Sequence, residues 1–133
     1  MWHLAAVYDL EGNRLWARRV QRPQHGWGHS ASPQFHGDLL LLHVRSLQAL
    51  DADTGELRWE ARARSRWGSP VLGRVHGFDV IVPASGDVID LASGNVLVKG
   101  LHALTYCAPV LKGDLVTFVE HGGEAVALSR TDE

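Results

Sequence analysis

The feature that most constrains the fold is a turn that the chain repeats about every 40 residues. Its most complete copy is the stretch 47–59, LQALDADTGELRW, in which an apolar run ends in Asp51 and a second run leads from Gly55 to Trp59. Short runs of β-forming residues around an Asp/Thr/Gly turn predict a β-hairpin, because the glycine can adopt the positive φ that such a turn needs. A fixed period is typical of an array of equivalent units.

The repeat consists of an aspartate, a glycine and an apolar residue four positions after the glycine. The aspartates are Asp9, Asp51 and Asp90, with spacings of 42 and 39 residues. The pairs of glycine and apolar residue are Gly12 with Trp16, Gly55 with Trp59, and Gly94 with Val98. A weaker fourth copy lies at 125–129.

A second signature alternates with the first. An aromatic residue and a Gly or Cys precede a Ser-Pro or Ala-Pro pair, and then come a glycine and another apolar run; the three copies begin at Trp27, Trp67 and Tyr106. Proline at the beginning of a strand removes no interior ladder hydrogen bond, so this placement suits a strand. The repeated unit is therefore four short strands. No stretch has the sustained 3.6-residue periodicity and caps that predict a helix.

Four strands in about 40 residues are typical of one blade of a β-propeller. The run of four leucines at 39–42 favours this fold, because a strand that is apolar at successive positions needs both faces covered. The alternative is a β-sandwich, whose strands would alternate more cleanly between apolar and polar residues.

We predict one all-β, partial propeller domain over residues 1–133, with blade repeats near 1–29, 30–68, 69–106 and 107–133. With the strands of a blade labelled A to D outward from the axis, the chain begins with C and D, at about 3–9 and 14–20. Two full blades follow, and A, B and C lie between 107 and 129. This assignment gives 13 strands, or about three blades and one further strand.

At Ala49-x-Asp51-x-x-Thr54-Gly55-x-x-x-Trp59 the sequence resembles the pyrroloquinoline-quinone-like repeat propellers, whose blades carry A-x-D-x-x-[TK]-G-x-x-x-W. The first copy lacks one turn residue and the third has Val98 in place of Trp, but the resemblance covers essentially the whole chain. It is greatest to bacterial propellers of this superfamily without assigned chemistry.

The resemblance implies that the repeat residues are structural, and that each Trp packs on the turn of the neighbouring blade. A buried indole N–H needs an acceptor, which a turn backbone can supply. The structural residues are Asp9, Gly12, Trp16, Asp51, Thr54, Gly55, Trp59, Asp90 and Gly94.

The same family contains quinoprotein alcohol and sugar dehydrogenases, which close about eight blades around a quinone and hold Ca²⁺ with a Glu/Asn/Asp set. This chain has about three blades, no C-x-x-C-H haem motif, and aspartates mainly at positions where turn chemistry alone requires them. We therefore expect no catalytic residues and no cofactor. The alternative is a subunit or fragment of such a dehydrogenase, which would use pyrroloquinoline quinone and Ca²⁺.

The eight histidines of the chain could suggest a metal site. His25 and His29 are four residues apart, but in a glycine-flanked loop rather than on a helix. Glu120 and His121 could join them only if the fold brought the two ends of the chain together. Since a catalytic zinc needs three protein ligands and a second shell, we predict that these histidines bind no metal.

Composition excludes several further classes. A net charge of −2 and a pI near 6.4 argue against nucleic acid as a partner, and no stretch approaches the roughly 20 apolar residues of a membrane span. The single cysteine, Cys107, excludes an intrachain disulfide, and we expect it to pack as a small hydrophobe. The sequence as given carries no signal peptide, although the resemblance implies relatives that are often exported or periplasmic.

Propellers usually bind ligands on the face made by the D-to-A and B-to-C loops. Aromatic, Arg and His side chains on this face would suit a polar ligand or a protein partner. The alternative, which the usual burial of tryptophan favours, is that Trp27 and Trp67 fill the interfaces between blades. The candidate binding residues are His25, Trp27, His29, Arg45, Arg64, Arg66, Trp67, Tyr106, Glu120 and His121.

Three blades leave two apolar blade faces and a sheet edge open, and such patches mark interaction surfaces. We therefore expect a non-catalytic scaffold or binding module that closes by association, most simply as a homodimer of about six blades. The C–D pair at one end and the A–B–C set at the other are complementary parts of one blade, with one copy of C redundant or displaced. The other explanation is that the chain is a piece of a longer protein.

Overall fold

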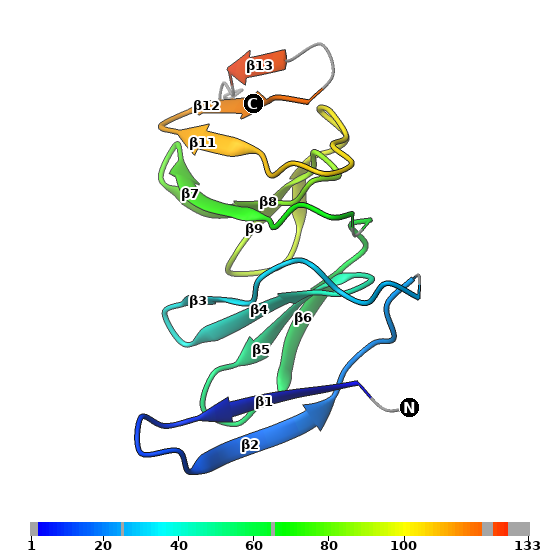
Figure 1. The fold of residues 1–133 in the computed structure, drawn as a ribbon. Helices are drawn as coiled ribbons and strands as arrows, with labels where there is room; N and C mark the ends of the chain where they lie inside the picture. Colours follow the sequence, from blue (N-terminus) through cyan, green and yellow to red (C-terminus); the bar gives the residue numbers. More distant parts are fainter. Residues whose placement is uncertain (1–2, 25, 65, 121–123, 128–133) are drawn as a thin grey trace.

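The computed structural model describes residues 3–24, 26–64, 66–120 and 124–127. These residues form thirteen strands in four antiparallel sheets, which follow one another in a stack from the N-terminal to the C-terminal end of the chain (Figure 1). No helix occurs within the described ranges, so none of them holds a helix that could cross a membrane.

The first sheet has two strands, the two middle sheets have four each and the last has three. The first sheet is β1 (Leu4–Tyr8) and β2 (Arg14–Arg19). The second is β3 (Gln34–His36), β4 (Leu39–His43), β5 (Leu47–Asp51) and β6 (Leu57–Ala61). The third is β7 (Val71–Val75), β8 (Phe78–Val82), β9 (Val88–Asp90) and β10 (Val96–Val98). The fourth is β11 (Val110–Lys112), β12 (Leu115–Phe118) and β13 (Glu124–Ala127).

Every sheet pairs its strands in chain order, each strand with the next one along the chain. The second and third sheets are complete blades, and the first and last are parts of blades. The prediction of all-β propeller blades is confirmed by these sheets. The treatment of residues 1–133 as one domain with the repeat boundaries given above stays a prediction.

The repeated turn has the same construction in both complete blades. The carboxylate of Asp51 accepts the amides of Asp53 and Thr54 at 3.0 and 2.9 Å, and the Gly55 amide donates to the Asp51 carbonyl at 2.8 Å. Gly94 has the same φ of 75° as Gly55, a conformation that an L side chain rarely adopts. Local hydrogen bonding by aspartate and the freedom of glycine therefore set this turn.

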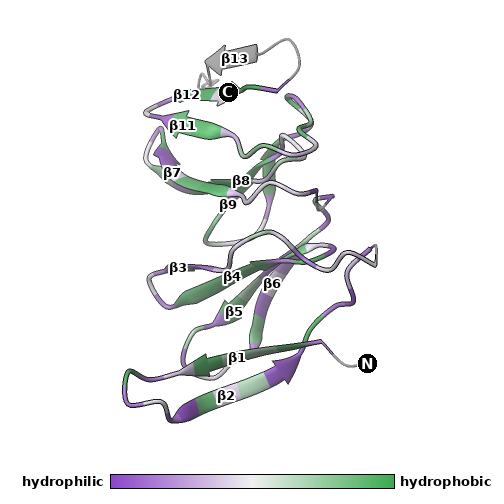
Figure 2. Cartoon of the chain, in the orientation of Figure 1, coloured by the Kyte–Doolittle hydropathy of each residue, from purple (hydrophilic) through white to green (hydrophobic). Residues whose placement is uncertain are grey.

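Three hydrophobic clusters hold the stack together, one between each pair of neighbouring sheets. Leu40, Leu42 and Leu50 face the first sheet, whereas Leu41 and Leu47 face the third. The run of leucines on β4 is thus buried on both sides, and Figure 2 shows β4 and β5 as apolar strands in the middle of the stack. A third cluster around Val80, Val116 and Phe118 joins the last two sheets.

Candidate functional site

The tryptophans of the repeat lie where one sheet meets the turn of the next. The Trp16 indole Nε1 donates to the Ala52 carbonyl at 2.8 Å, and its ring covers Gly55, where an added Cβ would stand 2.6 Å from the ring. These contacts fasten the outer edge of the first sheet to the second.

Trp59 makes the same contact one blade further on. Its Nε1 donates to the Leu91 carbonyl at 2.9 Å, and its ring lies on Gly94 at a distance that leaves no room for a Cβ. The indole therefore fixes the spacing of neighbouring blades through one hydrogen bond and one close ring contact.

Two positions of the repeat, one in the first copy and one in the third, have no such contact among the described residues. Gly12 has a φ of 86°, like the other two turn glycines, but nothing lies within 4 Å of the position that a Cβ would occupy there. Val98, which stands at the Trp position of β10, is exposed. One turn glycine, on the first sheet, and one docking position, on the third, thus make no contact of this kind.

Two of the candidate binding residues, His25 and His121, lie outside the described residues. Trp27 is 86% exposed, so it does not fill an interface between blades. Trp67 is half-buried, and its backbone joins neighbouring loops: its amide donates to the Thr105 carbonyl at 3.0 Å, and its carbonyl accepts the Ser30 hydroxyl at 2.8 Å. The two tryptophans therefore have different environments.

The Glu120 side chain is bound by backbone amides of a neighbouring loop. Its carboxylate accepts the amides of Thr105 at 2.9 Å and Tyr106 at 2.6 Å, and that of Cys107 at 3.3 Å. Glu120 thus shapes the loop on which Tyr106 is exposed. Cys107 is exposed as well, so the expectation that it packs as a small hydrophobe is wrong, because this loop turns it outward.

The structure brings His29 and Arg66 to one shallow depression of about 10 Å³. That volume is enough for one water molecule and not for a ligand. Burial lowers the pKa of His29 below its usual value. Arg64 is exposed on the loop that carries Arg66, and Arg45 is exposed in the connection between β4 and β5. Ligand binding at this loop face stays a prediction.

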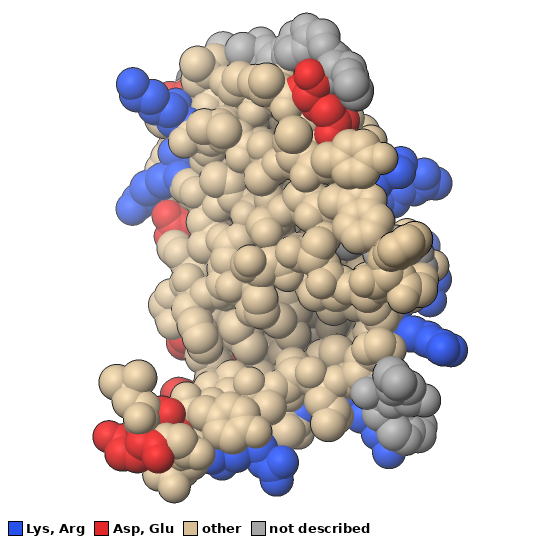
Figure 3. Space-filling view, viewed as in Figure 1, with Lys and Arg blue, Asp and Glu red and all other residues tan. Residues whose placement is uncertain are grey.

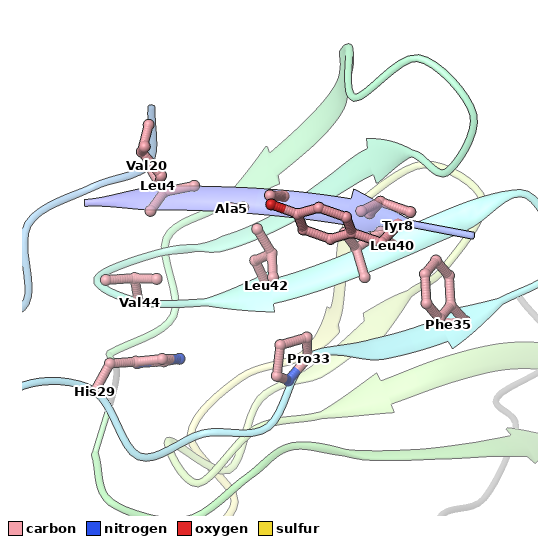
Figure 4. A pocket seen from close by; sticks show the side chains of 12 residues that line it. Leu4, Ala5, Tyr8, Val20, His29, Pro33, Phe35, Leu40, Leu42 and Val44 are labelled. Carbon is pink, nitrogen blue, oxygen red and sulfur yellow. The ribbon is translucent and has the colours of Figure 1, made fainter. Parts of the chain in front are cut away.

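A larger apolar groove of about 440 Å³ lies between the first two sheets. It runs along β1, where Ala5 and Val7 line it, and is closed on the other side by Phe35, Leu40 and Leu42 (Figure 4). None of the twelve residues around it is Asp, Glu, Lys or Arg. This groove was not predicted from the sequence, because its apolar lining comes from two different sheets and follows no local sequence pattern.

The comparisons with known proteins agree with the repeat. A protein-family model described as outer membrane protein assembly factor BamB, which represents pyrroloquinoline-quinone-like repeats, matches residues 3–133. The chain belongs to this family. No curated protein matches the sequence. The sequence-based assignment to the pyrroloquinoline-quinone-like repeat propellers is thereby confirmed.

The donor groups of the described residues do not fit the quinone and Ca²⁺ that the dehydrogenase alternative would use. The carboxylates of Asp9 and Asp90 accept bonds within their own turns, and Asp87 accepts the Gly100 amide and the Ser85 hydroxyl. In the described ranges, no three His, Cys, Asp or Glu side chains lie close enough together to hold a metal ion.

His43 is a histidine of the core that the sequence did not distinguish from the others. Its side chain is buried beneath the loop face, with Nε2 donating to the Ala63 carbonyl at 3.0 Å. Its Nδ1 has no partner among the described residues, and burial lowers the pKa of the ring. Burial therefore favours the neutral ring, which packs as part of the core.

The turn aspartate gives a testable pH dependence for this BamB-family chain. A hydrogen bond from the Arg58 guanidinium, helped by the Thr54 amide, lowers the pKa of Asp51 from 3.8 to about 2. Because folding favours the carboxylate, its contribution to stability is complete above about pH 4 and is lost as the pH falls toward 2. Acid unfolding followed by circular dichroism should show this part of the pH dependence in the wild type and not in Asp51→Asn.

The control for this measurement is Asp53→Asn, a change in the same turn at an exposed side chain. It should keep the wild-type profile between pH 4 and pH 2. If the acid-unfolding profile of Asp51→Asn is identical to that of the wild type, the ion pair between Asp51 and Arg58 does not contribute to the stability of the fold.

Proposed function

We propose that the chain is a non-catalytic propeller module that binds a protein partner, in the first instance a second copy of itself, to complete a ring of blades. Its working surfaces are the two open ends of the stack, the outward faces of the first and the last sheet. The carboxylates of Asp51, Asp90 and Glu120 accept backbone amides of turns and loops, which favours a scaffold over an enzyme.

The observation that carries this proposal is the exposure of large apolar side chains at both ends of the stack. Leu4, Tyr8 and Leu15 are exposed on the first sheet, and Val110 and Leu115 on the last. The central strands β4 and β5 of the second sheet bury residues on both faces, because a neighbouring sheet covers each face. An apolar sheet face that faces water is the usual mark of an interaction surface.

The distribution of charge argues against nucleic acid as the partner. Figure 3 shows the stack from the side, and over the described residues in this view Lys and Arg lie at the margins rather than in one patch. A nucleic-acid site would instead show clustered basic residues. The family description, that of an assembly factor for outer membrane proteins, fits a module that binds proteins.

The proposal predicts that the purified chain is a dimer, with twice the chain mass of 14.6 kDa in light scattering or native mass spectrometry. The physical reason is the gain from covering apolar faces, about 25 cal/mol per Å². A stable monomer at micromolar concentration would contradict the proposal.

Titration with pyrroloquinoline quinone and Ca²⁺ should leave the absorbance spectrum and dye reduction unchanged, whereas a response would favour the dehydrogenase subunit.

A further inference from the structure

We propose that the groove beside β1 binds the β11–β12 hairpin of a second copy of the chain, so that two copies share each of two blades. The inference rests on the proposed function and specifies which segments meet. It makes β1 and β2 the last two strands of a blade whose first two strands come from the other copy.

The first step is the free edge of β1. By its place in the repeat, β1 corresponds to β5 and β9, since Asp9, Asp51 and Asp90 follow or end these strands. β5 pairs with β4 and β6, and β9 pairs with β8 and β10, whereas β1 pairs only with β2 among the described strands. The unpaired edge offers backbone hydrogen bonds to another strand.

The second step is the chemistry of the groove. It lies beside that edge, against the face of β4 that carries Leu40 and Leu42, and it is about 440 Å³ in volume (Figure 4). A small-molecule site of this size would need several convergent polar groups. The lining contains no carboxylate, amine or guanidinium, and its one imidazole is that of His29. Strands with apolar side chains suit such a surface better.

The third step is the complementary end of the chain. β11 and β12 are the first two strands of a blade, and on one face Leu111, Val116 and Phe118 pack on the third sheet. On the opposite face Val110 and Leu115 are exposed. In a shared blade these two residues would cover the side of the second sheet that forms the groove.

A separate contact supports the same pairing. Trp16 covers Gly55 and Trp59 covers Gly94, each glycine belonging to the blade that follows. The blade that follows the third sheet is the shared one, whose turn contains Gly12 of the second copy. Val98 of one copy would therefore lie on Gly12 of the other. The two positions of the repeat that lack a contact within one chain would then contact each other.

The pairing requires an exchange of strands. In the single chain β13 pairs with β12 over four residue pairs, from Leu115 with Ala127 to Phe118 with Glu124. In the dimer, β1 of the second copy pairs with the edge of β12 that β13 occupies in the single chain. β13 must therefore separate from β12. Two whole blades from each copy and two shared blades then make a ring of six.

The test uses two charged substitutions at exposed positions, one on each side of the contact. Phe35→Glu, at a residue 60% exposed, places a charge in the groove, and Leu115→Glu, at a residue 42% exposed, places one on the hairpin. Each variant alone should run as a single chain in light scattering. A 1:1 mixture should form dimers, because one of its two junctions pairs an unchanged hairpin with an unchanged groove.

The matched control is Phe78→Glu, at a residue 46% exposed on β8, away from the groove and the hairpin; it should stay dimeric. If the wild type is a dimer and both variants remain dimers, or if their mixture stays monomeric, this pairing is wrong and the proposed function stands. If the wild type is a monomer, the proposed function fails as well. Circular dichroism on each variant reports whether it is folded.

A gain-of-function variant tests the Gly12 contact without destabilising the chain. Val98→Trp restores the indole that the other two outer strands carry, and the larger apolar area should lower the dimer dissociation constant about tenfold. A dissociation constant that is unchanged in a dilution series would overturn the contact between Val98 and Gly12.

Discussion

Replacing Trp59 with alanine is expected to lower the free energy of unfolding by about 3 kcal/mol. The indole packs in the cluster between the two complete blades and lies on Gly94, and its Nε1 donates to the Leu91 carbonyl. The change removes the ring and its hydrogen bond, and it leaves a void between the sheets. Urea unfolding followed by circular dichroism measures the loss.

The control for this prediction is Trp27→Ala, because Trp27 is a tryptophan on the surface of the same chain. Its replacement should change the free energy of unfolding by less than about 0.5 kcal/mol. Equal losses in the two variants would mean that the ring of Trp59 does not fasten one blade to the next.

Gly86→Ala is expected to cost on the order of 4 kcal/mol, which is much of the stability of a small protein. Gly86 has a φ of 80°, and a Cβ there would stand 2.1 Å from the His102 carbonyl oxygen. The Gly86 carbonyl also accepts the Leu101 amide at 2.9 Å, so the two backbone segments cannot separate without losing that bond. Thermal unfolding or the yield of folded protein measures the effect.

Gly113→Ala separates the effect of the close contact from that of the positive φ. Gly113 also has a positive φ, of 55°, but no atom lies within 4 Å of the position that its Cβ would occupy. Only the conformational strain remains there, so the loss should be about 1 kcal/mol. Similar losses at both glycines would show that the contact with His102 relaxes at little cost.

The turn and the order of strands could be predicted from the sequence, because local chemistry decides them. Asp51 accepts amides two and three residues away, and Gly55 supplies a backbone conformation that few other residues tolerate. Four consecutive leucines on β4 require a covering sheet on either side, which the structure provides.

The loop face could not be predicted in the same way, because contacts between distant loops follow no period. Glu120 had the chemistry of a ligand-binding residue, but its carboxylate accepts amides of residues 105–107. Nothing in the local sequence distinguishes the exposed Trp27 from the half-buried Trp67. The backbone of Trp67 is held by Thr105 and Ser30, contacts between loops that are 37 or more residues apart.

Each hydrophobic cluster described above joins two adjacent sheets and no others. A duplication of one segment of about 40 residues would therefore add one sheet and one cluster while the remaining clusters keep their side chains. A deletion would remove one of each. Genes for such chains can therefore change length by whole blades without selecting a new core.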